Sequence, residues 1–150
     1  MSAVRQFTCV AIDGRAVLID GAPGSGKSAL ALALIDRGAV LVGDDAVTLE
    51  PLGDTLWAAP PPNTAGLIEI RNVGIVTLPC IRAAVALLLR LDPAAPRFVE
   101  NAGMETIKGI AVPTLALYPD TPHLPLRAEW ALRQYGTVGQ VPPSQTPGHA

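Results

Sequence analysis

Apolar residues in the N-terminal part of the chain fall into short runs on either side of a helix-forming stretch. Residues 16–19 (AVLI) form an unbroken aliphatic run, which is typical of a buried strand. Residues 28–37 are rich in Ala and Leu, and Gly38 follows where a helix would end. A second apolar run at 39–42 comes directly afterwards. This order predicts strand, loop, helix and strand, and therefore an α/β fold.

Turn residues between other apolar segments predict two hairpins. Asp13 and Gly14 separate residues 7–12 from residues 16–19, and an Asp-Gly pair in that setting is a strong hairpin signal. A second hairpin is predicted over residues 47–58, where a Pro- and Gly-containing turn divides two alternating segments.

The pattern in the second half of the chain predicts further strands. Residues 67–71 alternate and are predicted as a strand. Residues 85–91 fit a helix or a strand, and the Asp-Pro pair that follows at once favours a buried strand. Residues 112–118 are predicted as a strand that Pro113 starts or interrupts.

The last predicted element is a helix over residues 126–135, bracketed by a first-turn proline and a glycine after the last turn. Leu126, Trp130 and Ala131 fall on one of its faces, and we expect them in the core. Residues 139–150 are rich in Pro, Gly, Ser and Gln and are predicted to be disordered. The sequence therefore predicts one domain over residues 1–138.

Composition and charge narrow the function classes. A chain of 150 residues suffices for one domain with a substantial core. The net charge of −2, with 16% charged residues, gives no indication of nucleic-acid binding. The longest apolar run, residues 83–89, is too short to cross a bilayer, and the N-terminus lacks a secretory pattern. We therefore expect a cytoplasmic protein.

The cysteines and histidines predict neither a disulfide nor a metal site. Cys9 and Cys80 are the only cysteines, and we interpret both as reduced thiols. His123 and His149 lie in Pro-rich segments without the spacing of metal ligands.

The octapeptide at 21–28 carries the clearest chemistry, because it matches G-x-x-x-x-G-K-[ST] at every fixed position. Its glycines permit positive φ and bring backbone N–H groups close to a polyphosphate. Lys27 can reach the β- and γ-phosphates, and the Ser28 hydroxyl is placed to ligate Mg²⁺. The helix that follows directs its N-terminal N–H groups and dipole at the phosphates. The predicted nucleotide-binding residues are Gly21, Ala22, Pro23, Gly24, Ser25, Gly26, Lys27 and Ser28.

Three acidic residues and one arginine bear on what happens to the γ-phosphate. Asp44 and Asp45 end the strand after the predicted helix, so their carboxylates should emerge at the sheet edge that holds the loop. One could hold Mg²⁺ and the other accept a proton from an attacking hydroxyl, or both could belong to an ordinary acidic turn. Glu69 is either solvent-facing or a metal-side carboxylate. Arg97 follows a Pro-rich loop, where most arginines are surface residues.

Together these segments resemble the catalytic domain of HPr kinase/phosphorylase, in the short form that lacks the family's N-terminal domain. The similarity is carried by GAPGSGKSALALALIDRGAVLVGDDAV at 21–47 and GLIEIRNVGI at 66–75. It implies a phosphoenolpyruvate-carboxykinase-like fold, in which a mixed sheet with flanking helices surrounds a phosphate loop, often assembled as a hexamer. It also implies phosphate transfer from ATP (or pyrophosphate) to a serine of the small phosphocarrier HPr, and removal of that phosphate by phosphorolysis.

The resemblance also implies roles for individual residues. Lys27 would bind the phosphates of ATP, and Ser28 and Glu69 would hold Mg²⁺. Asp45, supported by Asp44, would be the base that takes the serine proton and the acid in the reverse direction.

Some of the other positions match the family, and some depart from it. Arg97 matches its catalytic arginine, and Arg71 lies in its signature segment. Gln6 stands where the family has a catalytic histidine, fifteen residues before the first loop glycine, and a glutamine carries no proton at neutral pH. Asn72 replaces a glycine, and Asn tolerates positive φ best among the non-glycine residues. Residues 112–118 lack the basic residues of the family's phosphorolysis loop.

These departures favour the kinase direction over the phosphorylase direction. A serine kinase acting on an HPr-like carrier with ATP and Mg²⁺ is the leading hypothesis. A nucleotide-sensing module that binds ATP without efficient transfer is the alternative, indicated by Gln6 and Asn72. A small-metabolite kinase or simple ATPase ranks last, because no Arg-rich lid segment appears.

Overall fold

The computed structural model describes residues 2–119 and 122–137, and within them eleven strands and two helices form. The predicted disordered segment and His149 lie outside the described residues. The strands are β1 (Ala3–Arg5), β2 (Thr8–Ile12), β3 (Arg15–Gly21), β4 (Val40–Gly43), β5 (Val47–Leu52), β6 (Thr55–Ala59), β7 (Leu67–Ile70), β8 (Gly74–Thr77), β9 (Ala83–Leu91), β10 (Gly103–Ile107) and β11 (Ile110–Leu117). The helices are α1 (Lys27–Asp36) and α2 (Leu124–Tyr135).

A mixed, curled sheet forms the body of the domain, and β7 and β8 pair separately from it. Strand β9 runs parallel to β3 on one side and to β11 on the other, whereas β2 pairs antiparallel with β3 and with β4. The carboxyl ends of β3, β9 and β11 therefore meet at one edge, where Gly21, Leu91 and Leu117 succeed one another across the sheet. The predicted α/β fold with a mixed sheet is confirmed.

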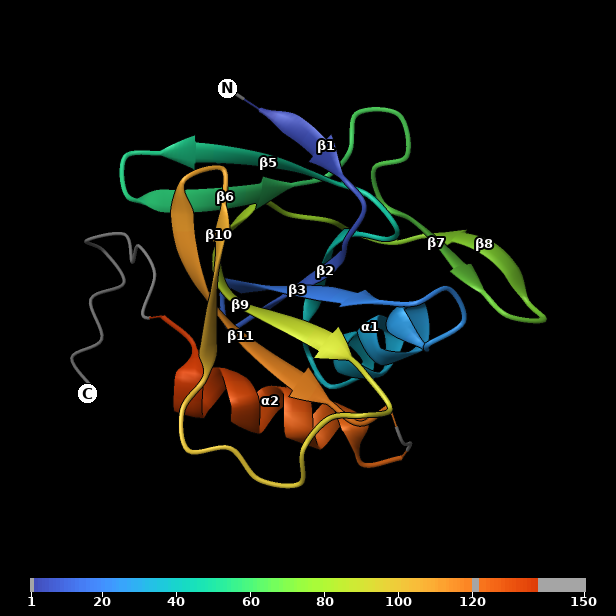
Figure 1. Ribbon diagram of the computed structural model, residues 1–150. Coiled ribbons are helices and arrows are strands. Elements are labelled where there is room, and N and C mark those ends of the chain that lie inside the picture. Colours follow the sequence, from blue (N-terminus) through green and yellow to red (C-terminus); the bar gives the residue numbers. More distant parts are fainter. Residues whose placement is uncertain (1, 120–121, 138–150) are drawn as a thin grey trace.

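Side chains of the central strands alternate between two cores. On β3, Ala16 and Leu18 face one core and Val17 and Ile19 face the other, as the period of two in a strand requires. The first core lies between the central strands and strands β5, β6, β10 and β11, and the second lies under α1 and α2. Figure 1 shows α2 below the central strands and α1 beside β9, with β1, β5 and β6 above them.

Helix α1 ends as the sequence predicts and returns the chain directly to the sheet. Gly38 has a φ of 110°, and the N–H groups of Gly38 and Ala39 donate to the carbonyls of Ile35 and Leu34. This is the Schellman arrangement, which closes a helix on a left-handed glycine. Strand β4 starts two residues later, so its end lies at the edge of the sheet that holds the loop after β3.

Both predicted hairpins form, and the structure adds a third. Asp13 and Gly14 have φ values of 51° and 79°, the two left-handed residues of the turn between β2 and β3. Strands β5 and β6 pair as expected. The sequence did not indicate the hairpin of β10 and β11, which turns at Lys108 and Gly109, because β10 buries only Ile107.

The strands predicted in the second half are present with two adjustments. Residues 85–91 belong to β9, so the choice of strand over helix is confirmed. Strand β11 begins at Ile110 and passes through Pro113, which neither starts nor interrupts it. Strand β7 ends at Ile70, so Arg71 lies in the turn and not in the strand.

The predicted core face of the last helix was wrong in part. The buried residues of α2 are Leu124, Ala128, Ala131 and Leu132. They form one stripe at helical spacing, which leaves Leu126 and Trp130 on the outer side, 43% and 60% exposed. The Trp130 ring instead contacts Arg133, whose guanidinium carbon lies 4.8 Å from the ring centroid.

Candidate functional site

The segment between β3 and α1 has the backbone conformation that the glycine-rich motif requires. Gly21, Gly24 and Gly26 have φ values of 156°, 80° and 102°, which L side chains rarely adopt. A Cβ atom on Gly21 would lie 2.5 Å from Ser25 Oγ and 3.2 Å from the Leu91 side chain. The loop therefore packs against the end of β9 so closely that only a glycine fits at its first position.

Two polar side chains of this loop, Lys27 and Ser25, differ in their hydrogen bonding. Lys27 Nζ donates to the Gly21 carbonyl oxygen at 2.7 Å, which folds the lysine over the loop. The Ser25 hydroxyl oxygen is buried, and no described group is its hydrogen-bond partner. Helix α1 starts at Lys27 with no side-chain cap and no acidic residue in its first turn. A helix N-terminus of this kind attracts anions.

The Asp44 carboxylate connects three elements at the end of β4. The Ser28 hydroxyl, from the first turn of α1, donates to Asp44 Oδ1 at 2.6 Å. The Thr8 hydroxyl, at the start of β2, donates to the same oxygen at 3.3 Å, and the backbone N–H of Glu69 donates to Oδ2 at 3.4 Å. The structure thus brings the Ser28 hydroxyl, the Asp44 carboxylate and the backbone N–H of Glu69 together.

Thr8 is a site residue that sequence reasoning missed. It is fully buried, and its hydroxyl both donates to Asp44 and accepts the backbone N–H of Asp45 at 3.1 Å. A lone threonine within the apolar segment 7–12 was the only signal in the sequence, and such residues are common.

Asp45 occupies an unusual backbone conformation that holds its carboxylate in solvent. Its φ is 62°, the side chain is exposed, and its N–H is tied to Thr8. The turn that contains Asp45 is tight, because a Cβ atom on Gly43 would overlap the carbonyl oxygen of Ala46. Asp and Asn tolerate left-handed φ better than most residues, so an aspartate here is sterically acceptable.

The hairpin of β7 and β8 projects from the body beside α1 (Figure 1) and carries the other acidic candidate. Glu69 and Arg71 are both exposed, and Glu69 contacts Asp44 through its backbone N–H. Asn72 has a φ of 69°, the positive value expected at this position. Within the described ranges, no group of three or more His, Cys, Asp or Glu side chains is arranged to hold a metal ion. The metal-binding roles of Ser28 and Glu69 stay predictions.

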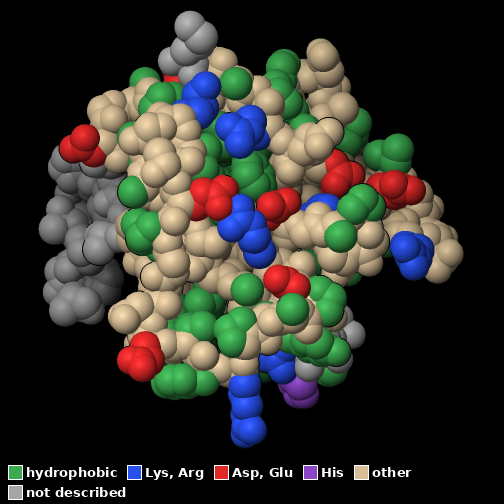
Figure 2. Space-filling view, viewed as in Figure 1, with side chains coloured by type: hydrophobic (Ala, Val, Ile, Leu, Met, Phe, Trp, Pro, Cys, Tyr) green, Lys and Arg blue, Asp and Glu red, His purple; other side chains and the backbone are tan. Residues whose placement is uncertain are grey.

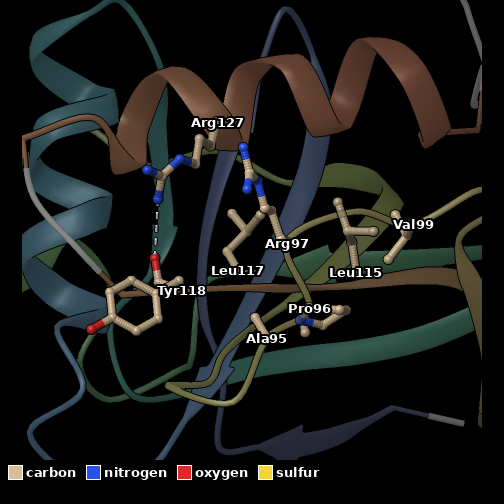
Figure 3. A pocket seen from close by; sticks show the side chains of 9 residues that line it. Ala95, Pro96, Arg97, Val99, Leu115, Leu117, Tyr118 and Arg127 are labelled. Carbon is tan, nitrogen blue, oxygen red and sulfur yellow. Dashed lines mark hydrogen bonds between the residues drawn. The ribbon is translucent and has the colours of Figure 1, made fainter.

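Arg97 lies near the end of β11, at the edge of the sheet that also holds the glycine-rich loop, and it lines a cavity there. It lines a space of about 440 Å³ together with Leu115, Leu117, Tyr118 and Arg127. Figure 3 shows its guanidinium beside that of Arg127, under α2. Arg127 Nη1 donates to the Tyr118 carbonyl oxygen at 3.4 Å. Among the hydrogen bonds and ion pairs of the described residues, none joins Arg97 to the loop, so its catalytic role also stays a prediction.

A second cavity, of about 380 Å³, is lined by Gln6 and by Asp20, the residue that precedes the loop. Arg90 Nε lies 3.4 Å from Asp20 Oδ2, and Arg90 Nη2 pairs with Glu105 on β10. The hydrogen bond with Glu105 is the main cause that raises the pKa of Arg90 above its ordinary value. Asp20 Oδ1 in turn accepts the backbone N–H of Gly21 at 2.9 Å. Figure 2 shows acidic and basic side chains gathered near the centre of this face.

The two cysteines, His123 and the helices were also the subject of sequence predictions. Cys9 and Cys80 are both free, as expected. Burial raises the pKa of the Cys9 thiol far above its ordinary value. His123 lies at the N-terminal end of α2. No helix in the described part of the chain has the length and apolarity needed to cross a membrane.

The fold and the site define a class: α/β domains with a mixed curled sheet, whose glycine-rich strand–loop–helix faces an aspartate at the end of a neighbouring strand. The model of the HPr Serine kinase C-terminal domain matches residues 2–84. The chain therefore belongs to the HPr kinase/phosphorylase family, to which it is related through that C-terminal domain.

Individual relatives agree with this assignment. The chain is 43% identical over 72 residues to an HPr kinase/phosphorylase of Clostridium acetobutylicum, covering 48% of this chain and 24% of that protein. It is 35% identical over 127 residues to that of Caldicellulosiruptor bescii, covering 75% and 41%. A solved structure of the Hpr(Ser) kinase/phosphatase from Coxiella burnetii matches with a TM-score of 0.77 and 32% identity, covering 88% of this chain and 89% of that one. The chain spans less than half the length of these two curated relatives.

Proposed function

We propose that this domain binds ATP with Mg²⁺ at residues 21–28 and transfers the γ-phosphoryl group to a serine of an HPr-like phosphocarrier. The observation that carries the proposal is the 2.6 Å hydrogen bond from Ser28 Oγ to Asp44, formed directly beside a loop with three left-handed glycines. Membership of the HPr kinase/phosphorylase family supports the reaction class.

The residues at the loop fit a nucleotide and its metal ion. The buried Ser25 hydroxyl lacks a described partner, and the space that a Cβ at Gly21 would fill is already taken up by the loop and β9. Ser28 and Asp44 offer the hard oxygen ligands that Mg²⁺ prefers, with Glu69 adjacent through its backbone. We assign Mg²⁺ to Ser28 and Glu69, where it would neutralise charge on the phosphate oxygens.

The transfer step follows from the positions of Asp45 and Lys27. The exposed Asp45 carboxylate takes the proton from the serine hydroxyl of the carrier. At the same time the serine oxygen forms a bond to the γ-phosphorus. The bond from that phosphorus to the β–γ bridging oxygen breaks, and ADP leaves. Lys27 moves from the Gly21 carbonyl to the phosphates and stabilises the charge that develops there.

Gln6 favours the forward direction over phosphorolysis. Its amide lines the cavity next to Asp20 and cannot hold or deliver a proton at neutral pH. The finer features implied by the resemblance complete the proposal: a phosphoenolpyruvate-carboxykinase-like sheet, a hexamer, a cytoplasmic location, and contributions of Arg71 and Arg97 to catalysis.

A phosphotransfer assay tests this function. The protein is mixed with ATP, Mg²⁺ and purified HPr-type carriers, and phosphoserine is detected by mass spectrometry, with the reverse reaction run on phosphorylated carrier and inorganic phosphate. We expect forward transfer that Asp45→Asn abolishes while ATP binding persists. ATP binding without transfer to any carrier, unaffected by Asp45→Asn, would support the nucleotide-sensing alternative.

A further inference from the structure

Three charged side chains from three strands meet beside the entrance of the loop. Asp20 and Arg90 are register partners on the parallel strands β3 and β9, and Glu105 reaches them from β10. Each of the three is more than a third exposed. Ion pairs with this exposure contribute little to folding stability, so stability does not account for the arrangement.

The position of Asp20 creates an electrostatic conflict with anion binding. One oxygen of its carboxylate accepts the N–H of Gly21, while the carbonyl of the same glycine accepts Lys27 Nζ. The Asp20 carboxylate and the Lys27 ammonium group therefore both bond to the backbone of Gly21, which places a negative charge near the lysine that is to bind phosphate. Left uncompensated, this charge repels a polyphosphate, and the repulsion is strongest at low ionic strength.

Arg90 is placed to remove that conflict. Its Nε faces the other Asp20 oxygen at 3.4 Å, and its Nη2 is occupied by Glu105. The guanidinium is planar and permanently charged, so it neutralises Asp20 without changing with pH. Its Nε faces Asp20 and its Nη2 pairs with Glu105, so Arg90 acts on the phosphates through its pairing with Asp20.

We propose that Arg90 is a positioning residue that neutralises Asp20 at the entrance of the phosphate loop, and that Glu105 sets how much of its charge is available. This inference rests on the proposed function, since it concerns the nucleotide site. It predicts effects of opposite sign for the two partners of Arg90. Loss of Arg90 weakens polyphosphate binding, whereas loss of the Glu105 charge leaves it equal or tighter.

The test measures binding of a non-hydrolysable ATP analogue with Mg²⁺ by calorimetry at low and high salt. Arg90→Gln is expected to weaken binding about tenfold at low salt, with the difference shrinking at high salt. Arg90→Gln with Asp20→Asn should return to within about twofold of the wild-type affinity, and Glu105→Gln should bind as tightly or up to about threefold more tightly. In turnover, Arg90→Gln raises KM with little change in kcat.

Arg37→Gln is the matched control, because it removes one guanidinium from an exposed pair with Glu129 at the far end of α1. It should bind the analogue like the wild type. Arg90→Lys keeps the charge and should remain close to wild type, which keeps the proposal testable if Arg90→Gln fails to fold.

Wild-type affinity in Arg90→Gln, no rescue by Asp20→Asn, or a loss that salt does not reduce would overturn the proposal. No analogue binding by the wild type would overturn both this inference and the proposed function. Analogue binding with the expected pattern, but no transfer to any carrier, would contradict only the proposed function.

Discussion

Ser28 and Asp44 are joined by a 2.6 Å hydrogen bond from hydroxyl to carboxylate across a separation of sixteen residues. The bond links the first turn of α1 to the end of β4, and Thr8 adds a second hydroxyl to the same carboxylate oxygen. Hydroxyl groups from α1 and β2 therefore fix the position of the Asp44 carboxylate at the end of β4.

Removal of the Ser28 hydroxyl should weaken binding of ATP with Mg²⁺ more than binding of ATP alone. For Ser28→Ala we expect about a tenfold loss with Mg²⁺, about 1.4 kcal/mol, because a metal ligand is lost while the loop backbone stays. Calorimetric titration with and without Mg²⁺ measures both affinities. Thr114→Val, which removes a hydroxyl bonded to the Val112 carbonyl on β11, is the control and should change neither. Equal losses with and without Mg²⁺ would contradict the metal role of Ser28.

Gly21→Ala should abolish nucleotide binding while the rest of the domain folds. The added Cβ would lie 2.5 Å from Ser25 Oγ and 3.2 Å from Leu91, so the loop must shift away from β9. Fluorescent-nucleotide binding and circular dichroism measure the two effects separately. Gly14→Ala is the control: its φ is also positive at 79°, but nothing lies within 4 Å of its added Cβ. It should cost about 1 kcal/mol of stability and leave nucleotide binding unchanged.

The Cys9 thiol should make the domain less stable at alkaline pH. Burial raises the pKa of Cys9 in the folded state, so above about pH 8.5 the unfolded chain loses this proton and the folded chain keeps it. Stability from this group is complete below that pH and falls as pH rises, by at most about 1.4 kcal/mol per pH unit. Urea unfolding from pH 7 to 10 should show a shallower decline for Cys9→Ala than for the wild type. Parallel curves would show that the thiol does not titrate differently in the two states.

The left-handed backbone at Asn72 predicts a ranking of substitutions. With a φ of 69°, Asn72→Gly should leave stability within a few tenths of a kcal/mol, whereas Asn72→Ala should destabilise the β7–β8 hairpin by about 1 kcal/mol. Hydrogen exchange of the hairpin amides measures this local stability. Equal protection in Asn72→Ala and the wild type would show that the turn adopts another conformation in solution.

Local sequence signals account for most of the elements and for the loop. The apolar run of β3, the Schellman end of α1 and the Asp13–Gly14 turn all follow from short-range rules, and each is present. The face of α2 did not follow from such rules. Leu126 and Trp130 lie on its outer side, because the position of the helix on the sheet, and not its own composition, determines which stripe is buried.

Contacts between residues that are far apart in the chain could not be predicted from local sequence patterns. Nothing in the sequence connects Thr8 to Asp44, or Asp20 to Arg90 and Glu105, because those contacts depend on strand order and register. Arg97 lines a cavity with Arg127 under α2, and its catalytic role stays a prediction.

By itself, the sequence determined the strand–loop–helix and the glycine positions of its loop, since glycine φ preferences and helix ends are properties of adjacent residues. Only the tertiary structure decided that Ser28 meets Asp44, that Asp45 is held in a left-handed turn by Thr8, and that Asp20, just before the loop, pairs with Arg90. Those relationships arise where strands far apart in the chain end at one edge of the sheet, and pairing across a sheet fixes which side chains come within hydrogen-bond distance.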